Sequence, residues 1–172
     1  ASKQYVFRAC FIDPFQGGVI AKFTLDNLKL KKTAVLYDVA SEYNKGIAEI
    51  FREVYEKNGG AIVAFETYTT NDKDFSSQLT KIKKANPDII FLPNYYSEVP
   101  LQIQQAKRLG ITVPFIGSDS WGSEELLKLC GKDCEGYYFS THYAADSASD
   151  ATKNFIAAYK ARYSTTPDDV AA

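Results

Sequence analysis

Short apolar runs alternate along the chain with longer stretches in which apolar residues recur every three or four positions. The short runs are rich in β-branched and aromatic residues, and they predict strands at residues 5–10, 33–37, 61–68, 88–93, 113–117 and 136–143. The longer stretches predict helices at residues 13–28, 44–57, 75–82, 98–110, 123–130 and 150–163. This alternation predicts an α/β fold: a doubly wound, mainly parallel sheet with helices on both faces, in three αβα layers.

Local signals mark where several helices begin and end. Asp13 suits the N-cap of the first helix, with Pro14 at the first helical position and Gln16 spaced for a capping box. Residues 58–60, Asn-Gly-Gly, stop the second helix, and Pro87 ends the third. These signals support the helix assignments independently of the apolar spacing.

Aromatic and acidic residues follow the ends of the predicted strands. In chain order they include Asp38, Tyr43, Tyr95, Asp119 and Trp121. In open parallel sheets the carboxyl ends of the strands meet at one edge, and ligands bind just beyond that edge. Aromatic walls with a few fixed polar groups are typical of small-molecule pockets. We therefore expect half of a small-molecule site at this edge.

Each of these residues has an expected role. Tyr43 and Tyr95 are expected to line the cleft. Asp119 would offer its charge to an ammonium group, and the face of Trp121 would add cation–π attraction. Asp38 fits a role at the start of the next helix and a ligand role equally well. The predicted ligand-binding set is therefore Tyr43, Tyr95, Asp119 and Trp121.

The composition narrows the range of partners. Hydrophobic residues make up 45% of the chain and charged residues 24%, the balance of a soluble globular protein. The net charge of -1 gives no basic field that would attract nucleic acid or an anionic membrane surface. No apolar run approaches the roughly 18 residues that would allow membrane insertion. Residues 1–7 show no signal-peptide pattern, so we expect a cytoplasmic, processed or excised chain.

The inventory of reactive residues argues against catalysis. His142 is the only histidine, and the chain has no Gly-x-Ser-x-Gly elbow, Walker A loop or Gly-x-Gly-x-x-Gly motif. We therefore expect a protein that is not an enzyme, with no catalytic residue and no cofactor. A zinc site would need three or four ligands, and we expect no metal. Cys130 and Cys134 could close a small disulfide loop, which the sequence leaves open.

A set of short motifs occurs in a fixed order along nearly the whole chain. The motifs are residues 5–8 and 11–17, Asp38 with Tyr43 and Gly46, residues 74–88, Tyr95 with Glu98 and residues 105–106, residues 115–117, and residues 135–137. In this order they resemble the second, C-terminal lobe of the periplasmic amino-acid-binding proteins of ABC transporters, the leucine/isoleucine/valine type.

The resemblance implies a type I periplasmic-binding fold, in which two α/β lobes close on an amino acid. Tyr43 and Tyr95 match cleft tyrosines of that family. Asp119 takes the place of an acid, commonly a glutamate, that pairs with the ammonium group. The resemblance implies that residues 1–172 are a single lobe excised from a two-lobe binding protein. The missing first lobe and an ABC permease would be its partners.

Further expectations follow from the resemblance. The whole protein would bind a branched-chain or other small apolar amino acid, and the sequence leaves open which one. The location would be periplasmic, or extracellular and lipid-anchored in a Gram-positive parent. One lobe offers a ligand one wall and open water, so we expect weak or no binding by the lobe alone. The alternative is a self-standing flavodoxin-like structural or interaction domain that forms a homodimer through its exposed cleft edge.

Overall fold

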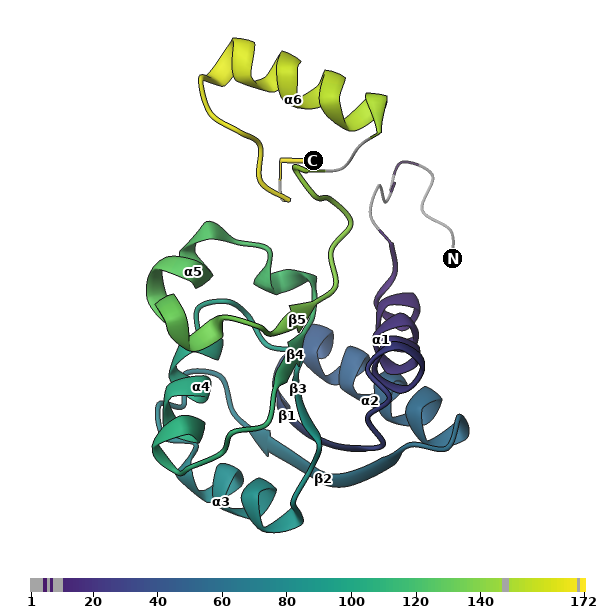
Figure 1. Cartoon of the computed structure of the whole chain (residues 1–172), viewed down its shortest axis with the longest axis vertical. Coiled ribbons are helices and arrows are strands. Elements are labelled where there is room, and N and C mark those ends of the chain that lie inside the picture. Colours follow the sequence, from purple (N-terminus) through teal and green to yellow (C-terminus); the bar gives the residue numbers. More distant parts are fainter. Residues whose placement is uncertain (1–4, 6, 8–10, 147–148, 170) are drawn as a thin grey trace.

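The structure, a computed structural model, describes residues 5, 7, 11–146, 149–169, 171 and 172 (Figure 1). Its helices are α1 (Asp13–Lys22), α2 (Glu42–Lys57), α3 (Ser76–Ala85), α4 (Val99–Arg108), α5 (Glu124–Cys130) and α6 (Asp150–Tyr163). Its strands are β1 (Lys32–Asp38), β2 (Ala61–Tyr68), β3 (Ile89–Leu92), β4 (Phe115–Gly117) and β5 (Tyr138–Phe139). The predicted α/β alternation is confirmed.

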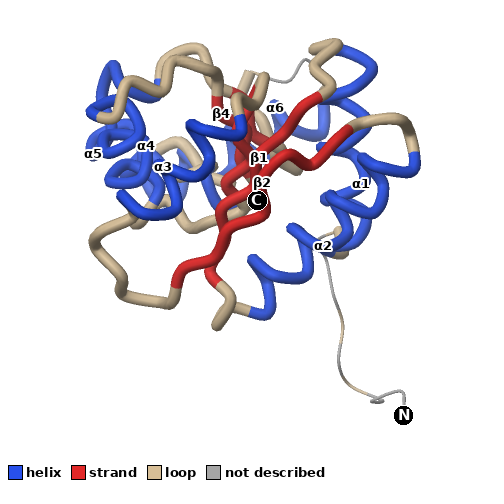
Figure 2. Tube along the Cα trace, turned by 90° about the horizontal axis from the view of Figure 1, so that it is seen from below, coloured by secondary structure: helices blue, strands red, loops and turns tan. Residues whose placement is uncertain are grey.

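The strands form one parallel sheet in the order β2-β1-β3-β4-β5. Helices cover both faces, with α1 and α2 on one side and α3, α4 and α5 on the other (Figure 2). The chain therefore winds in both directions from the centre of the sheet, as predicted. The direction of winding changes between β1 and β3, which pair with Val35 beside Phe91. In doubly wound sheets, ligands bind at the carboxyl side of such a switch point.

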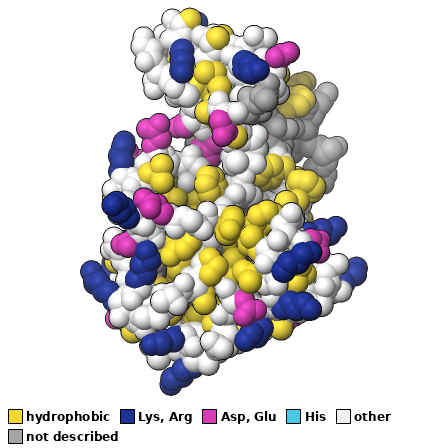
Figure 3. Space-filling model, in the orientation of Figure 1, with side chains coloured by type: hydrophobic (Ala, Val, Ile, Leu, Met, Phe, Trp, Pro, Cys, Tyr) yellow, Lys and Arg dark blue, Asp and Glu magenta, His cyan; other side chains and the backbone are white. Residues whose placement is uncertain are grey.

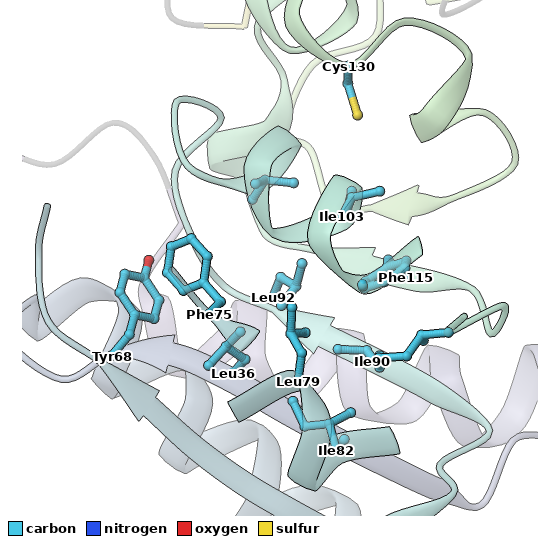
Figure 4. Close-up of a cluster of buried hydrophobic side chains, with 14 of the residues drawn as sticks. Leu36, Tyr68, Phe75, Leu79, Ile82, Ile90, Leu92, Ile103, Phe115 and Cys130 are labelled. Carbon is cyan, nitrogen blue, oxygen red and sulfur yellow. The ribbon is translucent and has the colours of Figure 1, made fainter. Parts of the chain in front are cut away.

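The side chains of β1 and β3 alternate between two separate cores. Leu36 and Leu92 belong to the core beneath α3, α4 and α5 (Figure 4). Val35 and Phe91 belong to the core beneath α1 and α2. All four side chains are fully buried. Because both faces of these strands are covered, their sequences read as continuous apolar runs rather than as polar–apolar alternation.

The start of the first helix differs in detail from the prediction. Ile12 is the N-cap and makes no side-chain cap hydrogen bond, so the prediction of Asp13 as N-cap is wrong. Asp13 is instead the first helical residue, where its negative charge still favours the positive end of the helix dipole. Beyond α1 the helix continues as a π-helical turn, Phe23–Asn27, within the predicted stretch.

The first and the last of the predicted strands have different outcomes. The strand predicted at residues 136–143 is much shorter, because β5 contains only Tyr138 and Phe139. Its neighbour β4 ends at Gly117, which pairs with Phe139, so the ladder cannot extend further. The strand predicted at residues 5–10 lies outside the described residues except for Tyr5 and Phe7, neither of which is in a strand.

Helix α6 stands apart from the layered unit (Figure 1), and basic side chains lie on its exposed surface (Figure 3). None of its residues is buried. Its aromatic side chains contact one another and the preceding loop: Phe155 packs on Tyr159 and meets Tyr143 edge-on. After α6 the chain returns to the layered unit, where Pro167 and Asp169 are buried. The bounds predicted for this helix are confirmed, although no described part of the chain buries its apolar face.

Cys130 and Cys134 form a disulfide, which settles the pairing that the sequence left open. The bond joins the end of α5 to the 3-10 turn that follows it, Gly131–Cys134. Cys130 is buried in the core beneath α3, α4 and α5 (Figure 4). The loop therefore anchors the edge of this layer to the core.

The core assignment predicts unequal costs for two truncations. Ile103 on α4 is fully buried, so Ile103→Ala should lower the free energy of unfolding by about 2–5 kcal/mol through lost burial and the cavity left behind. Leu127 on α5 is 67% exposed, and Leu127→Ala should cost less than about 0.5 kcal/mol. Urea unfolding followed by circular dichroism measures both, and equal costs would contradict the described core.

Candidate ligand-binding site

Three loops meet at the carboxyl edge of the sheet, beside the switch point. Residues 39–41 join β1 to α2, residues 93–98 join β3 to α4, and residues 118–123 join β4 to α5. β1, β3 and β4 are parallel neighbours, so their carboxyl ends and these loops lie side by side. The sequence predicted a site at this edge.

A hydrogen bond joins Tyr43 and Asp119 across 76 positions of the chain: the Tyr43 hydroxyl donates to Asp119 Oδ1. Ser41 helps to place Tyr43 by capping α2, because its Oγ accepts from the backbone N–H of Asn44 at 3.3 Å. Burial, and then the hydrogen bond to Asp119, raise the pKa of Tyr43 well above its ordinary value. Tyr43 therefore stays protonated and keeps its role as a donor.

Tyr95 completes an aromatic wall with Tyr43. The two rings stack with their centroids 5.4 Å apart and their planes inclined by 24°, a favourable arrangement for aromatic pairs. Tyr95 is 43% exposed and its neighbour Tyr96 is 38% exposed, so these rings lie at the protein surface rather than in the core. The structure thus brings together three of the predicted site residues: Tyr43, Tyr95 and Asp119.

These side chains line one cavity of about 490 Å³. Its lining residues are Tyr43, Tyr95, Tyr96, Asp119, Ser120, Ser123, His142, Asp168 and Asp169. The volume is in the range of small-molecule sites. Phenol rings and carboxylates together can orient a ligand that carries an ammonium group and an apolar part.

Several lining residues were not predicted from the sequence. Tyr96 and Ser120 adjoin predicted residues, so their position after a strand was a usable signal. His142, the only histidine of the sequence, lies with its Nε2 2.8 Å from the backbone oxygen of Asp169. Asp168 and Asp169 follow α6, far from any strand, and no pattern in the sequence pointed to them.

Trp121 lies beside this cavity rather than in its lining. It is 3% exposed, and it packs so closely over Gly117 that a side-chain carbon at that position would come within 2.1 Å of the indole. Trp121 lines a neighbouring cavity of about 280 Å³ together with Leu126 and Phe139. The cation–π role expected for Trp121 would require a ligand that reaches this second cavity, and it stays a prediction.

Asp38 serves the backbone at the end of β1. Its Oδ1 accepts from the N–H of Ala40 at 2.8 Å, and its Oδ2 accepts from the hydroxyl of Thr70. Asp38 is buried and does not line the 490 Å³ cavity. Of the two roles that the sequence left open for Asp38, these contacts support the local structural one.

Two features of the described part of the chain bear on other kinds of function. No group of three or more His, Cys, Asp or Glu side chains in that part is placed to hold a metal ion. None of its helices has the length and apolar character needed to cross a membrane.

A doubly wound α/β unit with a ligand-sized cavity at its switch point is typical of small-molecule-binding domains. The sequence places the chain within that class more closely, because residues 1–172 match the family described as "Periplasmic binding protein". The chain belongs to this family.

Two relatives of known name share about a third of the aligned residues. Leu/Ile/Val-binding protein homolog 3 of Brucella melitensis is 34% identical over 149 residues, which cover 87% of this chain and 39% of that protein. The leucine-, isoleucine-, valine-, threonine-, and alanine-binding protein of Pseudomonas aeruginosa is 32% identical over 157 residues, covering 91% and 42% respectively. Both names describe binding proteins.

Solved structures show the same relationship. A leucine binding protein, LivK, of Thermotoga maritima superimposes with a TM-score of 0.89 at 36% identity, covering 98% of this chain and 48% of that one. The branched-chain amino acid transporter substrate binding protein LivJ of Streptococcus pneumoniae, in complex with isoleucine, gives a TM-score of 0.87 at 36% identity, with the same coverage. The chain spans less than half the length of each of these four relatives.

The environment of Tyr43 predicts a late-ionising tyrosine. In an alkaline titration followed by tyrosinate absorbance, some tyrosines should ionise later than the ordinary tyrosine pKa of about 10. Tyr43→Phe should reduce the absorbance change of this late phase by the amount of one tyrosine. Asp119→Asn, which keeps the phenol but removes the charge, should move that ionisation to lower pH. Tyr43 has a higher pKa in the folded chain than in the unfolded chain. Its contribution to stability is therefore complete below about pH 10 and declines above it. An unchanged late phase in Tyr43→Phe would contradict the described contact.

Proposed function

We propose that this chain is the second lobe of an amino-acid-binding protein that serves an ABC transporter, and that it supplies one wall of a hinged cleft. The observation that carries the proposal is the convergence of Tyr43, Tyr95 and Asp119 on one cavity at the switch point. The printed names of the relatives, which include leucine, isoleucine and valine binding, support a branched-chain or other small apolar amino acid as the ligand.

In this proposal Asp119 receives the ammonium group of the ligand. The bond from Tyr43 to Asp119 Oδ1 fixes the orientation of the carboxylate, and Oδ2 is the atom that we assign to the ligand. The stacked rings of Tyr43 and Tyr95 form the adjoining apolar wall for an aliphatic side chain. The charge of Asp119 thus selects an amine, and the rings favour an apolar neighbour to it.

Closure of a second wall completes the mechanism. The relatives are more than twice as long as the segment they share with this chain, and the remaining length would supply the opposite lobe. Hinge closure over the ligand would exclude water from the contact with Asp119 and strengthen it. The lobe alone lacks this step, so it should bind weakly. An ABC permease would be the partner of the closed protein, in the periplasm or, with a lipid anchor, outside a Gram-positive cell.

The second candidate function, a self-standing domain that dimerises through its cleft edge, has one observation in its favour. Tyr95 and Tyr96 are 43% and 38% exposed at that edge, and exposed aromatic patches commonly mark interfaces. Sedimentation velocity over a hundredfold range of protein concentration distinguishes the two. A dimer that Tyr96→Ser dissociates would favour the second candidate over the ligand-binding lobe.

Ligand recognition predicts a selective response in NMR spectra of this chain. Titration with leucine into the millimolar range should shift the signals of Tyr43 and Tyr95, because their rings adjoin the atom assigned to the ammonium group. The compound 4-methylpentanoate, which has the leucine skeleton without its amino group, should leave them unchanged. Asp119→Ala should abolish the response to leucine, because the paired charge is lost.

The matched control is Asp133→Ala. Asp133 carries the same charge, but its Oδ1 pairs with Lys107 Nζ at 3.0 Å. It lies next to the disulfide in sequence and does not line the cavity. Its loss should leave the leucine response intact. Shifts that leucine and 4-methylpentanoate cause equally, or that survive in Asp119→Ala, would refute ammonium recognition by Asp119.

A further inference from the structure

A layer of buried polar side chains lies directly beneath the three cleft residues. Each cleft residue has a neighbour in sequence that belongs to this layer. Asn44 follows Tyr43, Asn94 precedes Tyr95, and Ser118 and Ser120 flank Asp119. Asn44, Asn94 and Ser118 are completely buried. Each of Tyr43, Tyr95 and Asp119 is therefore adjacent in sequence to a completely buried polar residue, and Ser120 both lines the cavity and bonds to this layer.

Asn94 is the centre of this layer. Its Nδ2 donates to the backbone oxygen of Leu36 on β1 at 3.0 Å and to Oε1 of Gln102 on α4 at 2.9 Å. Its Oδ1 accepts from Nδ2 of Asn44 on α2 at 3.1 Å. One amide therefore joins the end of β3 to the neighbouring strand β1 and to helices on both faces of the sheet.

The backbone of Asn94 extends the network to the third loop. Ser120 Oγ donates to the Asn94 carbonyl oxygen at 2.8 Å and lies 2.9 Å from Ser118 Oγ. Asp119 lies between these two serines in the sequence. Ser120 therefore joins the residue after Asp119 to the end of β3, and the Ser118 hydroxyl before Asp119 contacts the same Ser120 hydroxyl.

Buried amides impose one arrangement because an unsatisfied donor or acceptor in the interior is costly. Both N–H groups of the Asn94 side chain and its oxygen are used, each by a different element. A small shift of α2 or α4 would leave one of these groups without a partner. The network therefore resists relative movement of the elements that carry Tyr43, Tyr95 and Asp119.

We propose that Asn94 is a positioning residue for ligand recognition: it holds Tyr43, Tyr95 and Asp119 in their mutual arrangement without touching the ligand. The part of this proposal that concerns ligand affinity rests on the proposed function, but the part that concerns the arrangement of the three side chains does not. The stacking of Tyr43 on Tyr95 and the bond from Tyr43 to Asp119 exist without a ligand, so their geometry can be measured directly.

The test compares Asn94→Ala with Thr24→Ala in the full chain. Thr24 is also completely buried, and its hydroxyl donates to the Ile20 oxygen at 2.9 Å, outside the polar layer beneath the cleft. Each variant should lower the melting midpoint by roughly 3–10 °C, since each removes buried hydrogen bonding. NMR then reads the ring protons of Tyr43 and Tyr95 and the hydroxyl proton of Tyr43, with assignments from Tyr43→Phe.

We expect Asn94→Ala to shift the Tyr43 and Tyr95 ring signals and to weaken or remove the Tyr43 hydroxyl resonance, whereas Thr24→Ala leaves all of them in place. In the leucine titration, Asn94→Ala should reduce the affinity on the order of tenfold, with no change in Thr24→Ala. Tyrosine signals that respond alike in the two variants would overturn the positioning role, whatever leucine does. A wild-type chain that ignores leucine would count against the proposed function alone, because the tyrosine signals still decide the role of Asn94.

A second variant decides the matter if Asn94→Ala does not fold. Ser120→Ala removes the link between the Asn94 backbone and the loop that carries Asp119, together with the contact between the Ser120 and Ser118 hydroxyls. Ser120 is partly exposed, so the variant should fold. The Tyr43 hydroxyl resonance should move while the stacking signals of Tyr95 change less. A hydroxyl resonance identical to that of the wild type would overturn the proposal that the network positions Asp119.

Discussion

The parallel alignment of β1, β3 and β4 is the constraint on which the rest of the structure depends. Phe91 lies beside Val35 on one side and beside Ile116 on the other, so the three strands end at one edge. From that edge α2 and α4 leave on opposite faces of the sheet, which leaves space that neither helix fills. The cavity is thus a consequence of the winding of the chain. Any change that slides one strand against its neighbour would displace the residues of the site together.

The loops at this edge combine two kinds of side chain with opposite requirements. The residues that line the cavity include aromatic rings and a carboxylate, which need partial access to solvent to meet a ligand. The residues beneath them are amides and hydroxyls, and the Asn94 side chain is stable in the interior because both of its N–H groups and its oxygen find partners. Under the proposed function, the first kind would contact the ligand and the second would hold the first in position. Asn94 and Tyr95, adjacent in the sequence, show how one loop meets both requirements.

The sequence predicted most of the fold because its signals are local. The apolar spacing predicted α6 with its observed bounds and α2 to within two residues. The length of β5 could not be predicted from its own sequence, because the end of the neighbouring strand β4 determines it. Tyr43, Tyr95 and Asp119 were predicted from their places after strands. Trp121 lies two positions after Asp119 in a 3-10 turn, a rotation of about 240° that carries it from the cavity into the core. Asp168 and Asp169 reach the cavity only through the return of the chain after α6, which no local pattern encodes.

The disulfide between Cys130 and Cys134 has a consequence for how samples of this protein compare with one another. Cytosolic reductants keep thiols reduced, whereas export or oxidative refolding forms disulfides. Two preparations of identical sequence, from hosts that differ only in redox environment, can therefore be different covalent molecules. Because Cys130 is buried, its thiol in a reduced chain would react with labelling reagents only after local unfolding exposes it. Thiol counts under native and denaturing conditions would establish whether a sample contains the reduced or the disulfide-bonded form.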